Sequence, residues 1–201
     1  METDNQQQNE NSSLGAIKAF FWDFAKILAI SLAIIIPFRL LVAEPFVVSG
    51  SSMLPNFHNN DYLIIDRISY RSNDPERGDA VVIKYPKDNR QYFIKRIIGL
   101  PGESIEFRSG KVYIINSSYP QGKELTENYL PSNTPTLGKT GPFKLGDGEY
   151  FVLGDNRTAS SDSRVWGILP AKNIVGRVWV RVFPLGDFGF IKTPTYGNDK
   201  N

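Results

Sequence analysis

Residues 92–102 read YFIKRIIGLPG, an apolar run closed by a turn that is rich in glycine and proline. So apolar a run is expected to be a buried strand, yet it carries two cations in its middle. Because strand side chains alternate between faces, Lys95 lies between Phe93 and Ile97. A lysine among apolar groups loses hydration, and this disfavours its charged form. The run predicts either a lysine that acts as a base or one whose amine snorkels to water at the strand end.

Short strand-like runs between turn residues recur along the chain after Phe46. The expected strands are residues 62–65, 80–85, 92–98, 104–107, 111–115, 150–153 and 174–183, with turns at 77–79 and 108–110. No segment of helical period and length competes with them. The 17 glycines and 13 prolines also favour strands and turns over a helical bundle. We expect a compact all-β domain, with a loop at residues 117–148 that the pattern does not assign.

An apolar stretch at residues 20–42 precedes this domain. With its flanks it reaches the ~20 residues that cross a ~30 Å hydrocarbon core, although three charged residues interrupt it. A cleaved signal peptide is one alternative, because residues 41–43 resemble a small-residue cleavage site, but Pro45 and the long polar lead-in argue against it. A buried core helix fits poorly, because the stretch is apolar all round. We expect an uncleaved transmembrane anchor at residues 20–43.

The rest of the chain divides by composition. Residues 1–19 begin with a polar segment rich in Asn and Gln and are expected to form a disordered tail. The β-rich domain is expected at residues 44–192, followed by a polar C-terminal tail at 193–201. Lys18 and Lys26 precede the apolar heart of the anchor, which predicts a cytoplasmic N-terminus and an extracytoplasmic β-rich domain.

Composition excludes several kinds of chemistry. The chain has no cysteine, so disulfides, thiolate nucleophiles and Cys-ligated metals are excluded. Its one histidine, His58, lies in a polar turn, so we expect neither a zinc site nor a Ser-His-Asp triad. A net charge of +2 without a basic stripe argues against nucleic-acid binding. If the protein is a hydrolase, it needs a base other than histidine.

Two other polar segments are candidates for chemistry. Residues 49–55 read SGSSMLP, and residues 154–167 read GDNRTASSDSRVWG. The first is weak evidence by itself, because serine and glycine populate turns for conformational reasons. The second is either an exposed loop or, given its charged and hydroxyl groups, an internally hydrogen-bonded one in which Asp162 and Arg164 form an ion pair.

Together with RGDAVV at residues 77–82, these three segments resemble the bacterial type I signal peptidases, or leader peptidases. Four motifs keep the order and approximate spacing of that family from Glu44 to about Pro170. The resemblance is to the smaller form found in Gram-positive bacteria and cyanobacteria. It implies a catalytic domain of antiparallel β-sheets that uses no metal and no cofactor.

The resemblance also implies roles for individual residues. The serine immediately before Met53 matches the nucleophile, so Ser52 rather than Ser49 or Ser51 is expected to attack. Lys95 matches the general base, and Ser160 matches the hydroxyl that orients this lysine. Asp162 and Arg164 match a structural ion pair.

The chain departs from the family pattern beside the nucleophile. Gly50 stands where Gram-negative members have a serine whose hydroxyl helps to form the oxyanion hole. The hole is then expected to rest on backbone N–H groups, chiefly that of Ser52. The usual Thr-Leu after the proline is replaced by Asn56 and Phe57, which is expected to reshape the substrate pocket. The positions that match the pocket wall are Phe46, Val48, Met53, Phe57, Val82, Phe93 and Ile94.

By this resemblance the chain is expected to be a membrane-bound serine endopeptidase that removes signal peptides from secretory preproteins, after Ala-x-Ala-like residues. An extended peptide would bind by strand addition. Its partner is a lipid bilayer, the plasma membrane or alternatively the thylakoid membrane. The apolar residues 183–190 are expected either to contact lipid or to pack on the sheet.

Two rival functions share many of these features. A self-cleaving Ser-Lys protease of the repressor type predicts a chain without an apolar anchor, which residues 20–43 contradict. A non-catalytic, membrane-tethered peptide-binding domain accounts for the strands. It gives no reason for Ser52, Lys95 and Ser160 to occur together.

Overall fold

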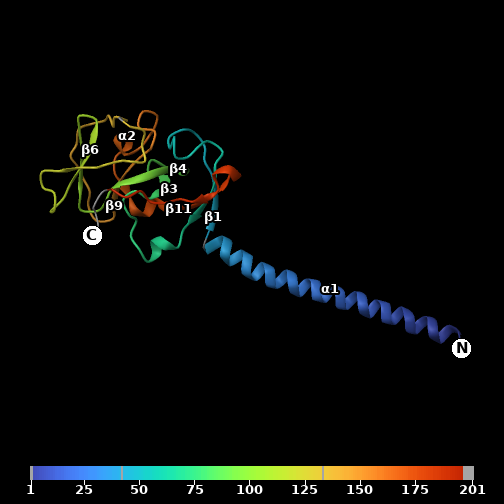
Figure 1. Ribbon diagram of the computed structural model, residues 1–201. Helices are drawn as coiled ribbons and strands as arrows, with labels where there is room; N and C mark the ends of the chain where they lie inside the picture. Colours follow the sequence, from blue (N-terminus) through green and yellow to red (C-terminus); the bar gives the residue numbers. More distant parts are fainter. Residues whose placement is uncertain (1, 42, 133, 197–201) are drawn as a thin grey trace. The chain divides into compact units, whose positions relative to one another are not determined.

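A computed structural model of the chain describes residues 2–41, 43–132 and 134–196 (Figure 1). The chain divides into two compact units, Met1–Val42 and Ala43–Asn201. The first contains one long helix, and the second contains the strands. Each unit is considered separately below.

The N-terminal unit is helix α1, Glu2–Leu41. Its segment Ile17–Ile36 has a mean hydropathy of 2.0 and is long enough to cross a membrane. Within this segment Lys26 Nζ lies 3.2 Å from Asp23 Oδ1, so the two opposite charges pair along one face of the helix. The helix also takes in residues 2–19, where the sequence suggests a disordered tail. Adding residues to an existing helix avoids a new nucleation step, and this favours its extension into a polar segment.

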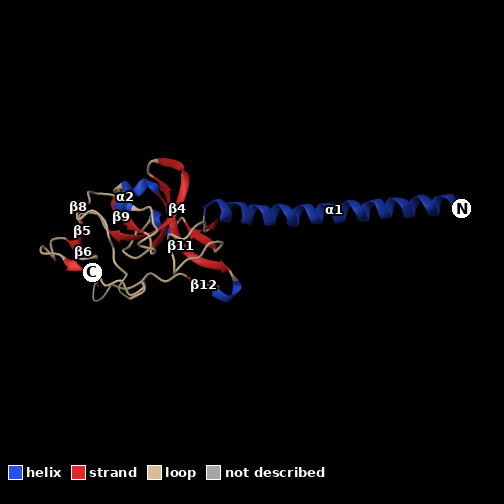
Figure 2. Ribbon diagram, turned by 90° about the horizontal axis from the view of Figure 1, so that it is seen from above, coloured by secondary structure: helices blue, strands red, loops and turns tan. Residues whose placement is uncertain are grey.

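The second unit is built mainly from one antiparallel sheet (Figure 2). Its strand order is β1-β2-β11-β3-β4-β9-β10, and β12 pairs with β11. The strands are β1 Ala43–Val47, β2 Tyr62–Asp66, β3 Ala80–Tyr85, β4 Asp88–Gly99, β9 Glu149–Leu153, β10 Leu169–Pro170, β11 Ile174–Phe183 and β12 Gly189–Phe190. Strand β4 lies between β3 and β9; residues 88–96 pair with β3 and residues 96–99 pair with β9.

A smaller antiparallel sheet has the order β7-β6-β5-β8. Its strands are β5 Ser104–Arg108, β6 Lys111–Ile115, β7 Lys123–Glu124 and β8 Phe143–Lys144. Ser109 and Gly110, both with positive φ, make the tight turn between β5 and β6. Strands β7 and β8 lie in the unassigned segment 117–148 and have two residues each. This is too short for alternation to be visible in the sequence.

Apart from α1, the helical segments of the described chain are short. They are α2 Ser163–Trp166 and the 3₁₀ turns η1 Ser69–Arg71, η2 Ala171–Asn173 and η3 Leu185–Asp187. All seven strands expected from the sequence are present. The mainly antiparallel β fold with one N-terminal apolar helix is therefore confirmed.

Three apolar clusters hold this domain together. The first packs the small sheet against β4 and β9 and includes Ile98, Ile105 and Phe151. The second joins β2, β3 and β11 to the segment after β1 and includes Met53 and Phe57. The third covers the remaining face of β3, β4 and β9; it includes Val81, Ile83, Ile97 and Trp166. Strand β4 contributes to all three clusters, so its register fixes residues in each of them.

The packed part of the chain extends beyond the predicted domain end at residue 192. Thr193 Oγ1 donates to Asp79 Oδ1 at 2.7 Å, and the Tyr196 side chain is buried in the first cluster. The segment 193–201 is polar in the sequence, but this tyrosine gives it an apolar contact. The described residues up to Tyr196 therefore belong to the domain rather than to a tail.

Candidate active site

Ser52 and Lys95 meet although 43 positions separate them in the sequence. Lys95 Nζ lies 2.8 Å from Ser52 Oγ and also donates to the Ile94 carbonyl oxygen at 2.8 Å. Lys95 sits in the middle of β4, where it is paired with Val81 of β3. Ser52 lies in the turn that follows β1. An amine in this position accepts a proton from the hydroxyl once it is itself neutral.

The Lys95 side chain is enclosed by apolar groups. The residue is only 3% exposed, and its amine lies 5.3 Å from the centre of the Phe93 ring on the same face of β4. Burial lowers the pKa of Lys95 to about 8, while the carboxylates of Asp162 and Asp155 partly oppose this effect. The lysine is thus close to the point at which it can serve as a base near neutral pH.

The turn that carries Ser52 is fixed at both ends. Gly50 has φ +97°, a conformation that favours glycine, and its N–H donates to Asn59 Oδ1 at 2.9 Å. On the other side, Asn156 donates from its backbone N–H to the Ser52 carbonyl oxygen at 3.0 Å. Its side-chain Nδ2 donates to the Ser51 carbonyl oxygen at 3.1 Å. Within the described residues the Ser52 N–H has no acceptor, so it is free to bind an incoming oxygen.

Ser160 lies against the same turn but does not touch the lysine through a hydrogen bond. Its hydroxyl is buried and has no hydrogen-bond partner among the described residues. A Cβ built on Gly154 would lie 2.1 Å from Ser160 Oγ and 2.5 Å from the Ser52 carbonyl oxygen. The close packing of Gly154, Ser160 and Ser52 therefore depends on a residue without a side chain at 154. The role of Ser160 in orienting Lys95 stays a prediction.

Asp162 and Arg164 form the contact that the sequence suggests. Arg164 donates from Nε to Asp162 Oδ1 at 2.8 Å and from Nη2 to Oδ2 at 2.7 Å. The fully buried Asp162 carboxylate also accepts from the Gly154 N–H at 3.0 Å. This two-bond ion pair therefore anchors the loop that holds Ser160 and Gly154.

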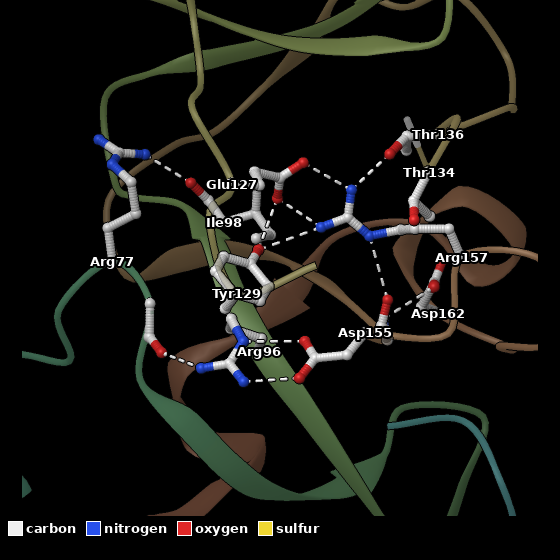
Figure 3. Close-up of polar contacts among 12 residues, drawn as sticks. Arg77, Arg96, Ile98, Glu127, Tyr129, Thr134, Thr136, Asp155, Arg157 and Asp162 are labelled. Atoms are coloured by element: carbon white, nitrogen blue, oxygen red, sulfur yellow. Dashed lines mark hydrogen bonds and ion pairs between the residues drawn. The ribbon is translucent and has the colours of Figure 1, made fainter. Parts of the chain in front are cut away.

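A second buried ion pair was not anticipated from the sequence (Figure 3). Arg96, next to the lysine, donates from Nε to Asp155 Oδ1 at 2.8 Å and from Nη2 to Oδ2 at 2.6 Å. Its guanidinium also packs 4.3 Å from the Tyr129 ring centre. Arg157 extends the network by ion pairing with Glu127. The one available signal was the second cation in the apolar run, because such a charge needs a buried partner.

The expected pocket positions mostly lie in the core. Six of them belong to or pack against the second cluster, whereas Phe93 packs on the third. The side chains of Val48, Met53, Phe57, Val82 and Ile94 are each at most 4% exposed. They are core residues of that cluster, and their contact with a substrate stays a prediction.

His58 lies in the turn that follows the nucleophile. His58 is exposed, and its backbone N–H donates to Asp61 Oδ2. In the part of the chain that the structure describes, no three His, Cys, Asp or Glu side chains gather where they could hold a metal ion.

Comparison with known proteins identifies one family. A family described as signal peptidase, peptidase S26, matches residues 21–183. A probable signal peptidase I-2 of Synechocystis sp. is 40% identical over 84% of this chain and 76% of its own length. A signal peptidase I of Bacillus amyloliquefaciens is 33% identical over 92% of this chain and 97% of its own. The crystal structure of a signal peptidase I from Enterococcus faecalis V583 covers 53% of this chain and 97% of its own, at 32% identity and a TM-score of 0.42.

Proposed function

Because the chain belongs to the signal peptidase family, peptidase S26, we propose that it removes signal peptides with Ser52 as nucleophile and Lys95 as general base. The observation that carries this proposal is the 2.8 Å contact between the buried Lys95 amine and the Ser52 hydroxyl. A charged lysine would only hydrogen-bond to that hydroxyl, whereas a neutral one takes its proton. Burial, which lowers the pKa of Lys95 to about 8, provides the neutral form.

The proposed reaction is acyl transfer in two steps. Neutral Lys95 takes the proton of Ser52 while Oγ attacks the scissile carbonyl carbon, and then gives that proton to the leaving amine. Water next attacks the acyl-enzyme and transfers its proton to the same lysine, which returns it to Ser52 as the acid is released. The free N–H of Ser52 would bind the oxyanion in both steps.

The proposed substrates are secretory preproteins with Ala-x-Ala-like cleavage sites. An extended peptide would bind through its backbone, with alternate small side chains entering pockets near the Ser52 turn. The candidate wall residues are Phe46, Val48, Met53, Phe57, Val82, Phe93 and Ile94, which are too large to leave room for bulky substrate side chains. Exclusion by overlap is a stronger filter than a missing methylene group, which costs ~1–3 kcal/mol.

The proposed location is the plasma membrane, with the thylakoid membrane as the alternative. The apolar segment Ile17–Ile36 would cross the bilayer once, with the N-terminus in the cytoplasm and the β domain on the opposite side. The β domain begins at Ala43, only nine positions before Ser52. This short connection would keep the nucleophile near the side of the membrane on which a preprotein emerges.

The experiment that tests the dyad is cleavage of a preprotein by the full-length chain and its variants. We expect Ser52→Ala and Lys95→Ala to lose at least ~10³-fold in kcat, because either residue alone cannot generate the alkoxide. Ser51→Ala, a neighbouring serine outside the contact, is the matched control and should retain activity. Wild-type activity should rise with pH through about 8 as Lys95 loses its proton. Undiminished cleavage by either dyad variant, or flat activity down to pH 5, would contradict the proposal and indicate another nucleophile or another base. No cleavage by the wild type would favour a non-catalytic peptide-binding domain.

A further inference from the structure

Asn156 contacts the peptide groups on both sides of the nucleophile. Its side-chain Nδ2 donates to the carbonyl oxygen of Ser51 at 3.1 Å, and its backbone N–H donates to that of Ser52 at 3.0 Å. The Ser51 oxygen also accepts from the Leu54 N–H within the turn itself, at 3.2 Å. Asn156 follows β9 and is more than 100 positions from the serine, so it ties the turn to the body of the sheet.

The Ser51 carbonyl and the Ser52 N–H belong to the same peptide group. This group is planar, and in the trans form its C=O and N–H point in opposite directions. Holding the Ser51 oxygen therefore fixes the direction of the Ser52 N–H. That N–H has no acceptor among the described residues, and it lies beside the Ser52 hydroxyl oxygen, which is the attacking atom.

On the N-terminal side of Ser52, fewer contacts restrain the backbone of the turn. Gly50 has no side chain, and a Cβ built there would meet nothing within 4 Å. Its backbone N–H donates to Asn59 Oδ1. Rotation of the Ser51–Ser52 peptide group is therefore resisted by Asn156 from outside the turn and by the Leu54 N–H from within it.

Asn156 is itself held in one orientation. The Thr158 hydroxyl donates to Asn156 Oδ1 at 3.1 Å, which leaves the amide NH₂ group to face Ser51. The preceding residue, Asp155, is fully buried and is bound by both arms of Arg96. Strand β4 thus positions the base directly through Lys95 and the nucleophile's turn indirectly through Arg96.

We propose that Asn156 is a positioning residue that orients the Ser52 N–H toward the oxyanion by fixing the two peptide groups around the nucleophile. This inference rests on the proposed signal-peptide cleavage by Ser52. It predicts a contribution to the transition state rather than to substrate binding, because the oxyanion exists only after attack. Asn156 itself is not expected to touch the substrate.

The decisive variants are Asn156→Asp and Asn156→Ala in the full-length chain. Aspartate has the shape of asparagine but no donor, so an acceptor would face the Ser51 oxygen. We expect kcat to fall by about 10- to 100-fold, less than the ~10²–10³ for complete loss of an oxyanion donor, with KM within about twofold. A peptide aldehyde, whose adduct with Ser52 places an oxygen in the oxyanion position, should lose affinity in parallel with kcat.

Asn59→Asp is the matched control for the added charge. It places a carboxylate beside the same turn but keeps the acceptor for the Gly50 N–H, so it measures the effect of the added charge, and its loss of kcat should be smaller than that of Asn156→Asp. Thr158→Ala removes only the hydroxyl that orients the amide and should give a smaller loss of kcat, again without a change in KM. This exposed position keeps the test informative if the Asn156 variants fold poorly.

The outcomes separate this inference from the function on which it rests. If Ser52→Ala cleaves as fast as wild type, the proposed function is wrong. If wild type cleaves and Ser52→Ala does not, but both Asn156 variants keep their kcat within threefold or raise KM with kcat unchanged, the positioning role is wrong. Where neither Asn156 variant folds, an unchanged kcat and aldehyde affinity in Thr158→Ala overturns it.

Discussion

At the scale of single residues, the burial that makes Lys95 a base also lowers the stability of the folded protein. Its amine is buried between β4 and the turn of Ser52, where water is replaced by the Phe93 ring and other apolar groups. Below a pH of about 8 the folded protein must hold a positive charge there, whereas the unfolded chain hydrates it freely. The property that makes this lysine a base therefore opposes folding at neutral pH.

Lys95→Met is expected to stabilise the protein at pH 7 while abolishing cleavage. The pKa of Lys95 falls from 10.5 to about 8 on folding, which corresponds to about 3 kcal/mol. Between these values the unfolded state binds more protons, so the stability of the wild type rises with pH. The advantage of the variant should be full below pH 8 and vanish by about pH 10.5. Urea unfolding across this range measures it.

Lys84, an exposed lysine on the neighbouring strand β3, provides the control for the change in stability. Lys84→Met removes the same charge from the surface of β3 and should change stability by less than about 0.5 kcal/mol. A Lys95→Met curve parallel to that of wild type between pH 8 and 10.5 would show that the folded lysine is not depressed, and the argument for its role as base would fail with it.

At the scale of elements, the side chains of β4 alternate between its two faces, and this places the cations Lys95 and Arg96 on opposite sides of the sheet. Lys95 faces the third apolar cluster with Phe93, and the next residue, Arg96, points to the opposite side and pairs with Asp155. Both partners of that pair are nearly inaccessible, with side chains 4% and 0% exposed. The strand therefore couples the chemistry on one face to a charged anchor on the other.

Asp155→Asn should destabilise the domain by about 3–5 kcal/mol, because it leaves the Arg96 charge buried without compensation. Thermal and urea unfolding measure this loss. Replacing both partners by apolar residues, as in Arg96→Met with Asp155→Leu, should recover much of the stability but not the activity, since Asn156 loses its neighbouring anchor. Glu124→Gln breaks the exposed pair with Lys111 and should have little measurable effect. An Asp155→Asn variant as stable as wild type would contradict the buried-charge argument.

Some elements of the fold could be predicted from the sequence, and others could not. Alternation and turn residues located β3, β4 and β11 because each is long enough to show its period. The segment 117–148 gave no such signal, since its order comes from individual side chains such as Glu127 binding Arg157. The same limit applies to the pair Arg96–Asp155: its members are 59 positions apart, and nothing local identifies the partner.

The candidate site, too, could be predicted from the sequence only in part. Local chemistry made Lys95 a candidate base, but only the resemblance of four motifs selected Ser52 among neighbouring serines. Neither local chemistry nor the resemblance predicted the contacts of Asn156 with the backbone of the turn, because the partner of a donor is set by the folded turn rather than by residue type. The expected ends of the β domain also shifted, as Tyr196 packs into its core.

At the scale of the whole molecule, exposed aromatic side chains gather at one end of the large sheet. Leu185 and Phe188, between β11 and β12, and Phe190 of β12 are each at least 63% exposed. The ring centres of Trp179 of β11 and Phe190 lie 5.7 Å apart. Soluble proteins seldom display neighbouring large apolar groups without a partner. Of the two expectations for residues 183–190, lipid contact and packing on the sheet, this exposed surface favours lipid contact.

Replacing Phe188 and Phe190 by serine in the β domain, residues 43–201, should weaken its binding to liposomes. Burying a phenylalanine side chain is worth roughly 1.5–3 kcal/mol, so the double variant is expected to bind at least about tenfold more weakly in a vesicle sedimentation assay. Leu137→Ser removes another exposed apolar side chain, 68% accessible, from a different loop and serves as the control. Because these phenylalanines are solvated in the folded domain, the variants should unfold as wild type does. Equal binding of the double variant would mean that the surface packs against something other than lipid, and membrane attachment would then rest on α1 alone.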